Sequence, residues 1–274
     1  MSKTIQKKEQ NSGDAMRSVM TIVAIIAAYV VSYLVYHFIM GNPINFEGAN
    51  IEGHPKVGNY LAIIYKGGFI VPILMTINLV LIIFTIERFI SLSAAAGKGR
   101  VNVFVKNIQN DLKADKIEDA IVRCDKQKGS LANVLKAGLV RYRDLQTEGT
   151  LSKDQKILAL QKEFEEATAL ELPTLSRNVV IISTIASISV LCGLLGTVFG
   201  MIRAFAALAT SGSPDATALS TGISEALVNT ALGIGGSLLA IILYNYFSTR
   251  IDNFTFKIDE AGFSLVQSFA ASTK

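Results

Sequence analysis

The sequence predicts an all-α, polytopic membrane protein with four transmembrane helices, whose long helices extend into a cytoplasmic helical domain. Half of the 274 residues are hydrophobic and only 18% are charged, whereas a typical soluble domain has about 25% charged residues. Four apolar runs reach or approach the roughly 17–25 residues that a helix needs to cross a bilayer. They lie at about residues 19–40, 69–86, 178–208 and 222–247.

Residues 1–45 are expected to form an N-terminal cytoplasmic tail and a membrane anchor. Basic residues precede the first apolar run, as they do in a secretory signal. However, the apolar run is longer than in a signal peptide, and no small-x-small cleavage pattern follows Met40. We therefore expect this anchor to be retained.

Residues 46–68 are rich in glycine and are predicted to be a periplasmic amphipathic segment. Within it, Tyr60 to Tyr65 is a short amphipathic piece whose aromatic rings would lie at the membrane surface. Residues 69–88 follow as a transmembrane helix. Its apolar run ends at Glu87 and Arg88, which we interpret as an interfacial charged pair.

Residues 89–177 contain no long apolar run and are predicted to form a cytoplasmic helical domain. Ser152 and Gln155 have the spacing of a capping box, as do Asp115 and Glu118. Pro173 is expected to kink the last helix or to mark its boundary. Apolar side chains recur at helical spacing, namely Ile117, Ala120, Ile121, Cys124, Leu131, Val134, Leu135 and Leu139.

The last two apolar runs lie within residues 178–247 and are unusually long for a bilayer, so their helices should tilt or project as a continuous bundle. Residues 248–274 are expected to be a cytoplasmic C-terminal helix. Lysine and arginine are dense before residue 19 and between 89 and 177, sparse in 41–66 and absent from 209–221. This distribution predicts that both termini are cytoplasmic, and it accounts for the net charge of +4 without nucleic acid.

No pattern typical of an enzyme is present. The sequence lacks a Ser/His/acid grouping, a phosphate-binding glycine loop followed by lysine, and a dinucleotide fingerprint. The two cysteines, Cys124 and Cys192, are not expected to pair, and with His37 and His54 they give no metal-ligand spacing.

Glu225 is an acid near the start of the last apolar run. An ionisable residue inside a spanning helix costs roughly 2.5 kcal/mol or more, so by default it marks an ion or proton pathway. The alternative is an interfacial cap, because negative charge is favoured at a helix N-terminus. Arg203, near the outer end of the third run, is expected to extend to the interface, or to pair with Glu225 or Asp215.

Polar and small residues stand out in the third and in the fourth apolar run. In the third run Gly193, Gly196 and Gly200 favour close helix packing, and Thr197 among them either faces a polar path or bonds to its own helix four residues back. In the fourth run one helical face is polar or small and must meet a helix, a pore or a water-filled cavity. The alternative is a polar clamp without transport. This face comprises Glu225, Asn229, Gly233, Gly236, Ser237 and Ala240, with Thr230 beside Asn229.

The segments Gly193–Gly200 and Gly222-Ile-Ser-Glu225-Ala-Leu-Val-Asn-Thr230-Ala-Leu-Gly233 resemble the ExbB/TolQ/MotA proton-channel family, and most closely its ExbB and TolQ branches. The resemblance assigns residues 178–247 to the proton-channel core and implies that Glu225, Thr197, Thr230 and Asn229 line the pathway.

The resemblance also implies an assembly. It implies a homopentamer in the bacterial inner membrane around a dimer of an ExbD- or TolR-like single-span protein, whose aspartate is protonated. A TonB- or TolA-like protein is a further implied partner, and protons are the coupling ion, without a cofactor. The function implied is proton-driven energisation of TonB-dependent outer-membrane transport, or envelope maintenance for a TolQ-type subunit. The extra N-terminal anchor, Arg203 and Asn229 depart from the family pattern.

Overall fold

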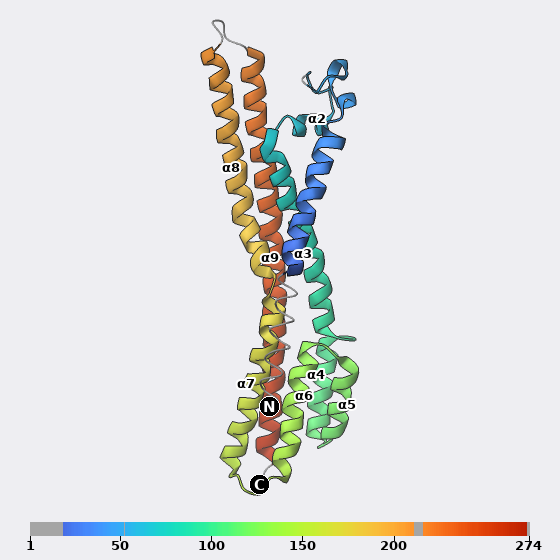
Figure 1. Cartoon of the computed structure of the whole chain (residues 1–274). Helices are drawn as coiled ribbons and strands as arrows, with labels where there is room; N and C mark the ends of the chain where they lie inside the picture. Colours follow the sequence, from blue (N-terminus) through green and yellow to red (C-terminus); the bar gives the residue numbers. More distant parts are fainter. Residues whose placement is uncertain (1–18, 52, 211–215, 273–274) are drawn as a thin grey trace. The chain divides into compact units, whose positions relative to one another are not determined.

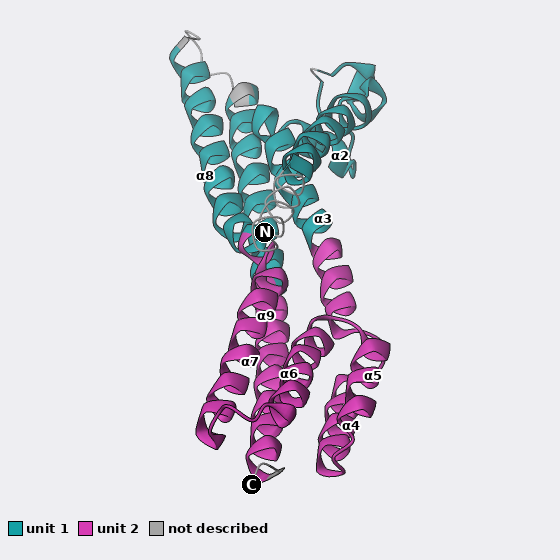
Figure 2. Cartoon of the chain, turned by 60° about the horizontal axis from the view of Figure 1, so that its bottom comes forward, with its two compact units in different colours: residues 1–84, 181–243 teal, residues 85–180, 244–274 magenta. Residues whose placement is uncertain are grey.

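The computed structural model describes residues 19–51, 53–210 and 216–272, and all regular elements among them are helical (Figure 1). Four helical stretches are long and apolar enough to cross a membrane, which confirms the predicted fold class. They are Val19–Met40, Gly68–Lys113, Lys153–Ala209 and Leu219–Ala271. The chain forms two compact units: residues 1–84 with 181–243, and residues 85–180 with 244–274 (Figure 2).

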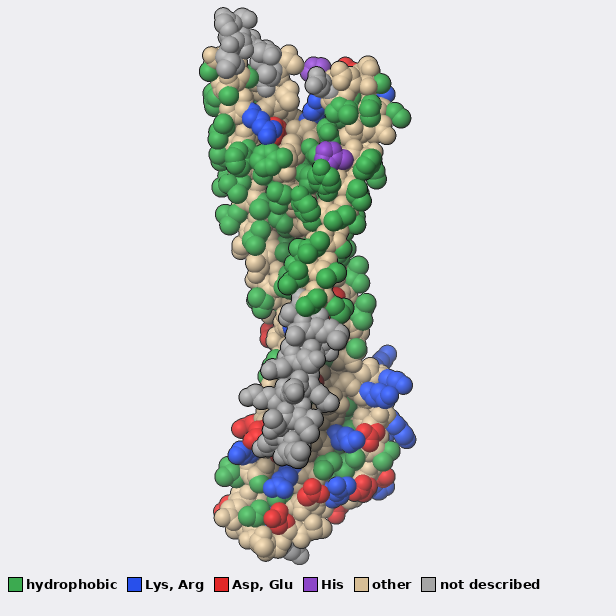
Figure 3. All heavy atoms as spheres, in the orientation of Figure 1, with side chains coloured by type: hydrophobic (Ala, Val, Ile, Leu, Met, Phe, Trp, Pro, Cys, Tyr) green, Lys and Arg blue, Asp and Glu red, His purple; other side chains and the backbone are tan. Residues whose placement is uncertain are grey.

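Unit 1 contains the N-terminal helix, described from Val19 and ending in the π-helical turn η1, together with short elements that connect it to longer helices. Hydrophobic side chains cover its visible face, as a lipid-facing surface requires (Figure 3). The elements are η1 (Val35–Met40), η2 (Pro43–Asn45), η3 (Glu47–Ala49), α2 (Tyr60–Tyr65), η4 (Gly68–Ile70), α3 (Val71–Ala96), α8 (Val179–Thr210) and α9 (Ala216–Ser272), of which α3, α8 and α9 also contribute residues to unit 2.

The segment between the first two spans folds back onto the N-terminal helix. The Tyr36 hydroxyl donates a hydrogen bond to the carbonyl of Tyr65 at 3.0 Å, and the two rings stack with centroids 4.6 Å apart. The short piece Tyr60–Tyr65 that stood out in the sequence forms the helix α2, and the Asn59 side chain caps it by accepting from the Ala62 amide. These contacts hold the turn at Gly67 and Gly68 in place before α3 begins.

Unit 2 is a helical domain with one apolar core, and charged side chains gather on its visible face (Figure 3). Its own helices are α4 (Val101–Lys113), α5 (Ile117–Gln127), α6 (Ser130–Thr147) and α7 (Lys153–Ser176). The apolar residues that the sequence spacing singled out are all buried in this core. The core also includes residues of α9, among them Ile258, Leu265 and Phe269.

The helix-boundary predictions had mixed outcomes. Ser152 and Gln155 form the expected capping box, but the box at Asp115 is wrong. Asp115 has a φ of 56° and its amide bonds back to the Leu112 carbonyl at 3.1 Å, so it closes α4 instead of capping α5. Pro173 lies inside α7, which continues to Ser176.

Arg88 forms the expected charged pair with Glu87, and its side chain is buried in the protein. It is 2% exposed, pairs with Glu87 at 2.5 Å and donates from Nη1 to the carbonyl of Leu175 at 3.1 Å. The helix α3 continues past this pair to Ala96. Because the last carbonyls of a helix lack intrahelical donors, Arg88 anchors the end of α7 to α3.

Candidate functional site

The candidate site is built around Glu225, which lies in the third turn of α9. This helix begins at Ala216, so Glu225 is too far from the first turn to act as its cap, and the cap interpretation is wrong. The Glu225 side chain is only 6% exposed. A carboxylate at this depth needs a counter-charge or hydrogen-bond donors.

Arg203 of α8 supplies that counter-charge. Its Nη1 lies 2.8 Å from Oε1 and 3.1 Å from Oε2 of Glu225. The Arg203 side chain is 52% exposed, and its guanidinium carbon lies 5.4 Å from the centre of the Phe69 ring. Of the alternatives for Arg203, the pair with Glu225 is therefore the one observed, and Asp215 lies outside the described residues.

Gly68 makes room for the Glu225 carboxylate. Its φ is +78°, and a Cβ placed on it would overlap the Glu225 carboxylate and lie 3.2 Å from Nη1 of Arg203. A positive φ disfavours residues with a side chain. The turn before α3 therefore presents bare backbone to the ion pair.

Asn229 lies one turn further along α9 and is completely buried. Its Nδ2 donates to the carbonyl of Gly67 at 2.8 Å. A Cβ on Gly196 of α8 would lie 2.6 Å from Asn229 Cγ, so the missing side chain at Gly196 accommodates the amide. Asn229 thus connects α9 to α8 and to the turn before α3.

Thr197 and Thr230 form a hydroxyl pair between α8 and α9. Their Oγ1 atoms are hydrogen-bonded to each other. Thr197 also lies 3.2 Å from the Gly193 carbonyl, four residues back, and Thr230 donates to the Ala226 carbonyl at 3.1 Å. The local bond that was one alternative for Thr197 is thus available, together with a cross-helix bond that the sequence did not predict. Both threonine side chains are half-buried.

Glycines bring α8 and α9 into backbone contact on both sides of this pair. A Cβ on Gly193 would lie 3.0 Å from the Gly233 Cα, and a Cβ on Gly200 would lie 2.9 Å from the Gly222 carbonyl oxygen. Further along, a Cβ on Gly236 would lie 2.6 Å from Asn78 Oδ1. Small residues allow such close approach between helices in lipid.

The polar face of α9 therefore meets α8 along its length and residues 67–78 at two levels. Sequence reasoning did not single out Gly67, Gly68 or Asn78. Asn78 had a usable signal, because an amide inside the apolar run 69–86 needs a polar neighbour. The two glycines had none, since the turn-rich segment around them contains many glycines.

Four long apolar helices, with a buried carboxylate that is ion-paired between two of them, define a multi-pass membrane protein with a polar interior. Residues 126–260 belong to the MotA/TolQ/ExbB proton channel family, which confirms the resemblance. The matched segment contains Glu225, Arg203 and Asn229 as well as the threonine pair. It is a family of channels, in agreement with the prediction that the chain is not an enzyme.

The chain is similar to proteins of both predicted branches. It is 30% identical to the Tol-Pal system protein TolQ of Pseudomonas aeruginosa over 117 residues, which are 43% of this chain and 51% of that protein. It is 40% identical over 84 residues to TolQ of Haemophilus influenzae, or 30% of this chain and 36% of that protein. It is 30% identical over 98 residues to the biopolymer transport protein ExbB of Pseudomonas putida, 36% of this chain and 30% of that protein. The chain spans about half or less of the length of these relatives.

Among the described residues, no group of three or more histidine, cysteine, aspartate or glutamate side chains is placed to hold a metal ion. Cys124 and Cys192 are both free thiols. The candidate site therefore consists of the ion pair, the buried amide, the threonine pair and the glycine contacts.

Proposed function

We propose that this chain is the scaffold subunit of a proton-driven motor in the bacterial inner membrane, with both termini in the cytoplasm. In this proposal five copies surround a dimer of an ExbD- or TolR-like single-span protein in a central pore. The motor uses the proton-motive force to energise TonB-dependent transport across the outer membrane through a TonB-like protein. The observation that carries the proposal is the buried Glu225 in the matched channel segment.

The geometry supports a role for Glu225 in shaping a polar interior. The Glu225 carboxylate forms an ion pair with Arg203. Its negative charge is therefore balanced by the guanidinium, and Glu225 does not act as a free proton carrier. Thr197 and Thr230 remain half-buried between α8 and α9, where hydroxyls can contact a partner helix or water. The proton would then be carried by the aspartate of the partner, with Glu225, Thr197, Thr230 and Asn229 forming its surroundings.

Exposed apolar side chains on α8 support an assembly in the membrane. Leu191, Leu194 and Val198 lie on this surface and are between 48% and 58% exposed. Such a surface faces either lipid or neighbouring helices, and a ring of subunits would use part of it.

The alternatives differ in partner or in conduction. A TolQ-type subunit would work with a TolA-like protein in envelope maintenance, and the similarity to TolQ proteins supports this candidate equally. A non-conducting membrane scaffold would assemble through the glycine contacts alone and would need no partner with a protonatable residue.

The first experiment measures proton-motive-force-dependent uptake in a strain that depends on this chain. Glu225→Ala is expected to abolish uptake, because it removes the buried acid of the channel segment. The matched control is Glu260→Ala, which removes an exposed acid from the same helix. Full uptake by Glu225→Ala, at normal abundance in the membrane, would contradict the proposal.

The second experiment identifies the partner by co-purification and native mass spectrometry. A complex of five copies with two copies of a small single-span protein supports the motor, and the further presence of a TonB-like or a TolA-like protein separates the two branches. A homo-oligomer that purifies alone from cells expressing the neighbouring genes, with no proton flux in liposomes, would support the non-conducting scaffold.

A further inference from the structure

Unit 2 contains a cavity of about 590 Å³ beside the loop that joins α3 to α4. The loop and the first turn of α4 form one wall, and one face of α9 forms another. The α9 residues that line it are Arg250, Asn253, Phe254 and Lys257, which are spaced by three and four residues and so share a helical face. The cavity is separate from the Glu225 site, which lies in unit 1.

Three cationic side chains line this cavity, namely Arg100, Arg250 and Lys257. In the part of the chain that the structure describes, no acidic side chain lines it. None of the three cations forms an ion pair with a carboxylate among the residues that the structure describes. Arg250 makes a cation–π contact, with its guanidinium carbon 5.8 Å from the Tyr246 ring centre. Like charges gathered at one cavity repel each other, so a bound anion would stabilise the arrangement.

Neutral donors line the same cavity. The amides of Asn102 and Asn253 and the hydroxyl of Ser93 contribute to its surface. The helix α4 begins at Val101. The backbone carbonyl of Arg100, the residue before it, accepts hydrogen bonds from the amides of Val103 and Phe104. The amides of the first two residues of the helix have no intrahelical acceptor, and a helix N-terminus favours negative charge.

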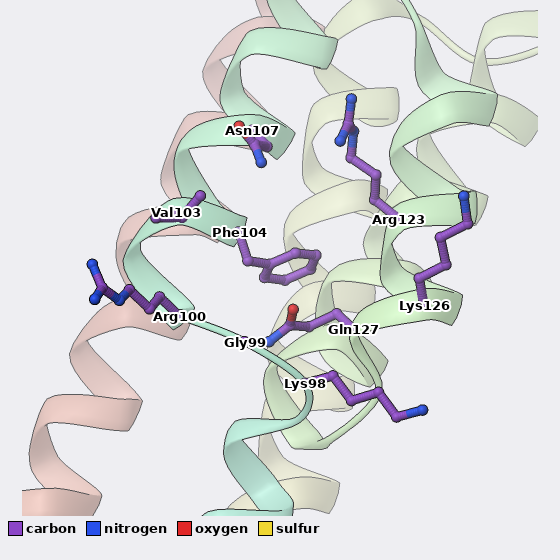
Figure 4. A pocket seen from close by; sticks show the side chains of 9 residues that line it. All are labelled: Lys98, Gly99, Arg100, Val103, Phe104, Asn107, Arg123, Lys126 and Gln127. Carbon is purple, nitrogen blue, oxygen red and sulfur yellow. The ribbon is translucent and has the colours of Figure 1, made fainter.

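A smaller neighbouring cavity of about 290 Å³ is also lined by four cationic residues, but they do not form a cluster of unpaired cations (Figure 4). Phe104 and Gln127 lie in its middle, and Lys98 points away from Arg100. Arg123 is already paired with Asp111. Figure 4 also shows Arg100 extending toward α9, which is the side of the larger cavity.

We propose that the larger cavity binds a phosphate group, and that its source is the headgroup of an anionic phospholipid. A phosphate oxygen matches the guanidinium and ammonium donors of Arg100, Arg250 and Lys257. The position favours a lipid. The apolar run of α3 ends at Ile86 and that of α9 at Phe247, so Leu92 and Arg250 lie about 9 Å and about 5 Å beyond those ends along their helices. That is the depth of a headgroup, and Leu92 and Phe254 offer apolar contact beside it.

The test uses the full chain in a neutral detergent and native mass spectrometry with two lipids of identical acyl chains, phosphatidylglycerol and phosphatidylcholine. We expect at least about tenfold tighter binding of phosphatidylglycerol, saturating at one molecule per chain, because each juxtamembrane cation strengthens anionic-lipid binding several-fold. Arg250→Gln combined with Lys257→Gln should remove most of this preference. The matched control is Lys106→Gln with Lys113→Gln, which removes equal charge from exposed positions of α4 outside the cavity.

A second variant protects the test against a folding defect. Asn253→Asp places a carboxylate at the wall of the cavity through an exposed, nearly isosteric side chain, and it should also lower the preference about tenfold while the melting temperature is unchanged. If neither cavity variant lowers the preference, the proposed site is wrong.

A separate arm distinguishes the source of the phosphate. Inorganic phosphate and glycerol phosphate are titrated while the melting temperature of the wild type and of both cavity variants is followed. The melting temperature of the wild type alone could rise saturably with phosphate while phosphatidylglycerol is not preferred over phosphatidylcholine. That result would support a phosphate site but assign it to a soluble ligand. Equal losses in the cavity and control variants would mean diffuse surface charge and overturn the proposal, as would the absence of any response to lipid or phosphate.

Discussion

Replacing Arg203 with glutamine is expected to destabilise the contact between α8 and α9. The change leaves the Glu225 carboxylate, 6% exposed, without its cation. The two N–O distances of 2.8 and 3.1 Å correspond to a gross attraction of about 6 kcal/mol at an effective dielectric constant of about 20 and about 1.4 kcal/mol in water. Because Arg203 is 52% exposed, the lower part of this range applies, and we expect a loss of about 2 kcal/mol.

A double-mutant cycle with Glu225→Gln isolates the pair. The two single variants each lose the ion pair, whereas the double variant no longer buries an unpaired charge, so the coupling energy should be about 2 kcal/mol. In thermal unfolding of the purified protein this amounts to about 4–8 °C for Arg203→Gln, with partial recovery in the double variant. Lys106→Gln, an exposed charge change, serves as the control. Strictly additive effects of the two substitutions would refute the reasoning.

Three further predictions concern packing and protonation. Gly196→Ala should lower stability by about 1–3 kcal/mol, because the added Cβ meets Asn229, whereas Gly235→Ala, whose Cβ would meet nothing within 4 Å, should be neutral or stabilising in the same melting assay. Asn229→Ala should cost about 1–3 kcal/mol, since the buried Gly67 carbonyl loses its donor, and an unchanged melting temperature would contradict this. Burial raises the pKa of the Cys124 thiol to about 12, so native protein should resist alkylation of Cys124 at pH 8 while unfolded protein reacts; the stability from the buried neutral thiol is complete below pH 9 and is lost as the pH rises toward 12.

The fold followed from the sequence because its signals are local. A run of apolar residues of sufficient length has few alternatives to a spanning helix, and the spacing of Leu131, Val134 and Leu135 fixes a buried helical face. Asp115 was misjudged because the same residue type that caps a helix also tolerates a left-handed conformation. In this chain the αL conformation that ends α4 prevailed.

The candidate site was only partly predictable, because its partners are remote in sequence. The spacing along α9 placed Glu225 and Asn229 on one face, but it carried no information on what that face meets. Gly67 accepts a bond from a residue 162 positions away, and Gly68 matters only through the space it leaves for Glu225. Contacts of this kind depend on how the helices pack, which no local pattern encodes.

The hydroxyl pair of Thr197 and Thr230 has a consequence of its own, because each hydroxyl has a single hydrogen to donate. In one arrangement Thr197 donates to Thr230, which donates to the Ala226 carbonyl. In the other, Thr230 donates to Thr197, which donates to the Gly193 carbonyl. Both arrangements contain two hydrogen bonds and share the one between the two hydroxyls, and they differ in whether the Ala226 or the Gly193 carbonyl is the final acceptor. The direction of donation between the two threonines can therefore reverse by rotation of the hydroxyl hydrogens alone, without a change of rotamer or helix position. The contact that joins the two helices is thus rigid in its heavy atoms and switchable in its hydrogens.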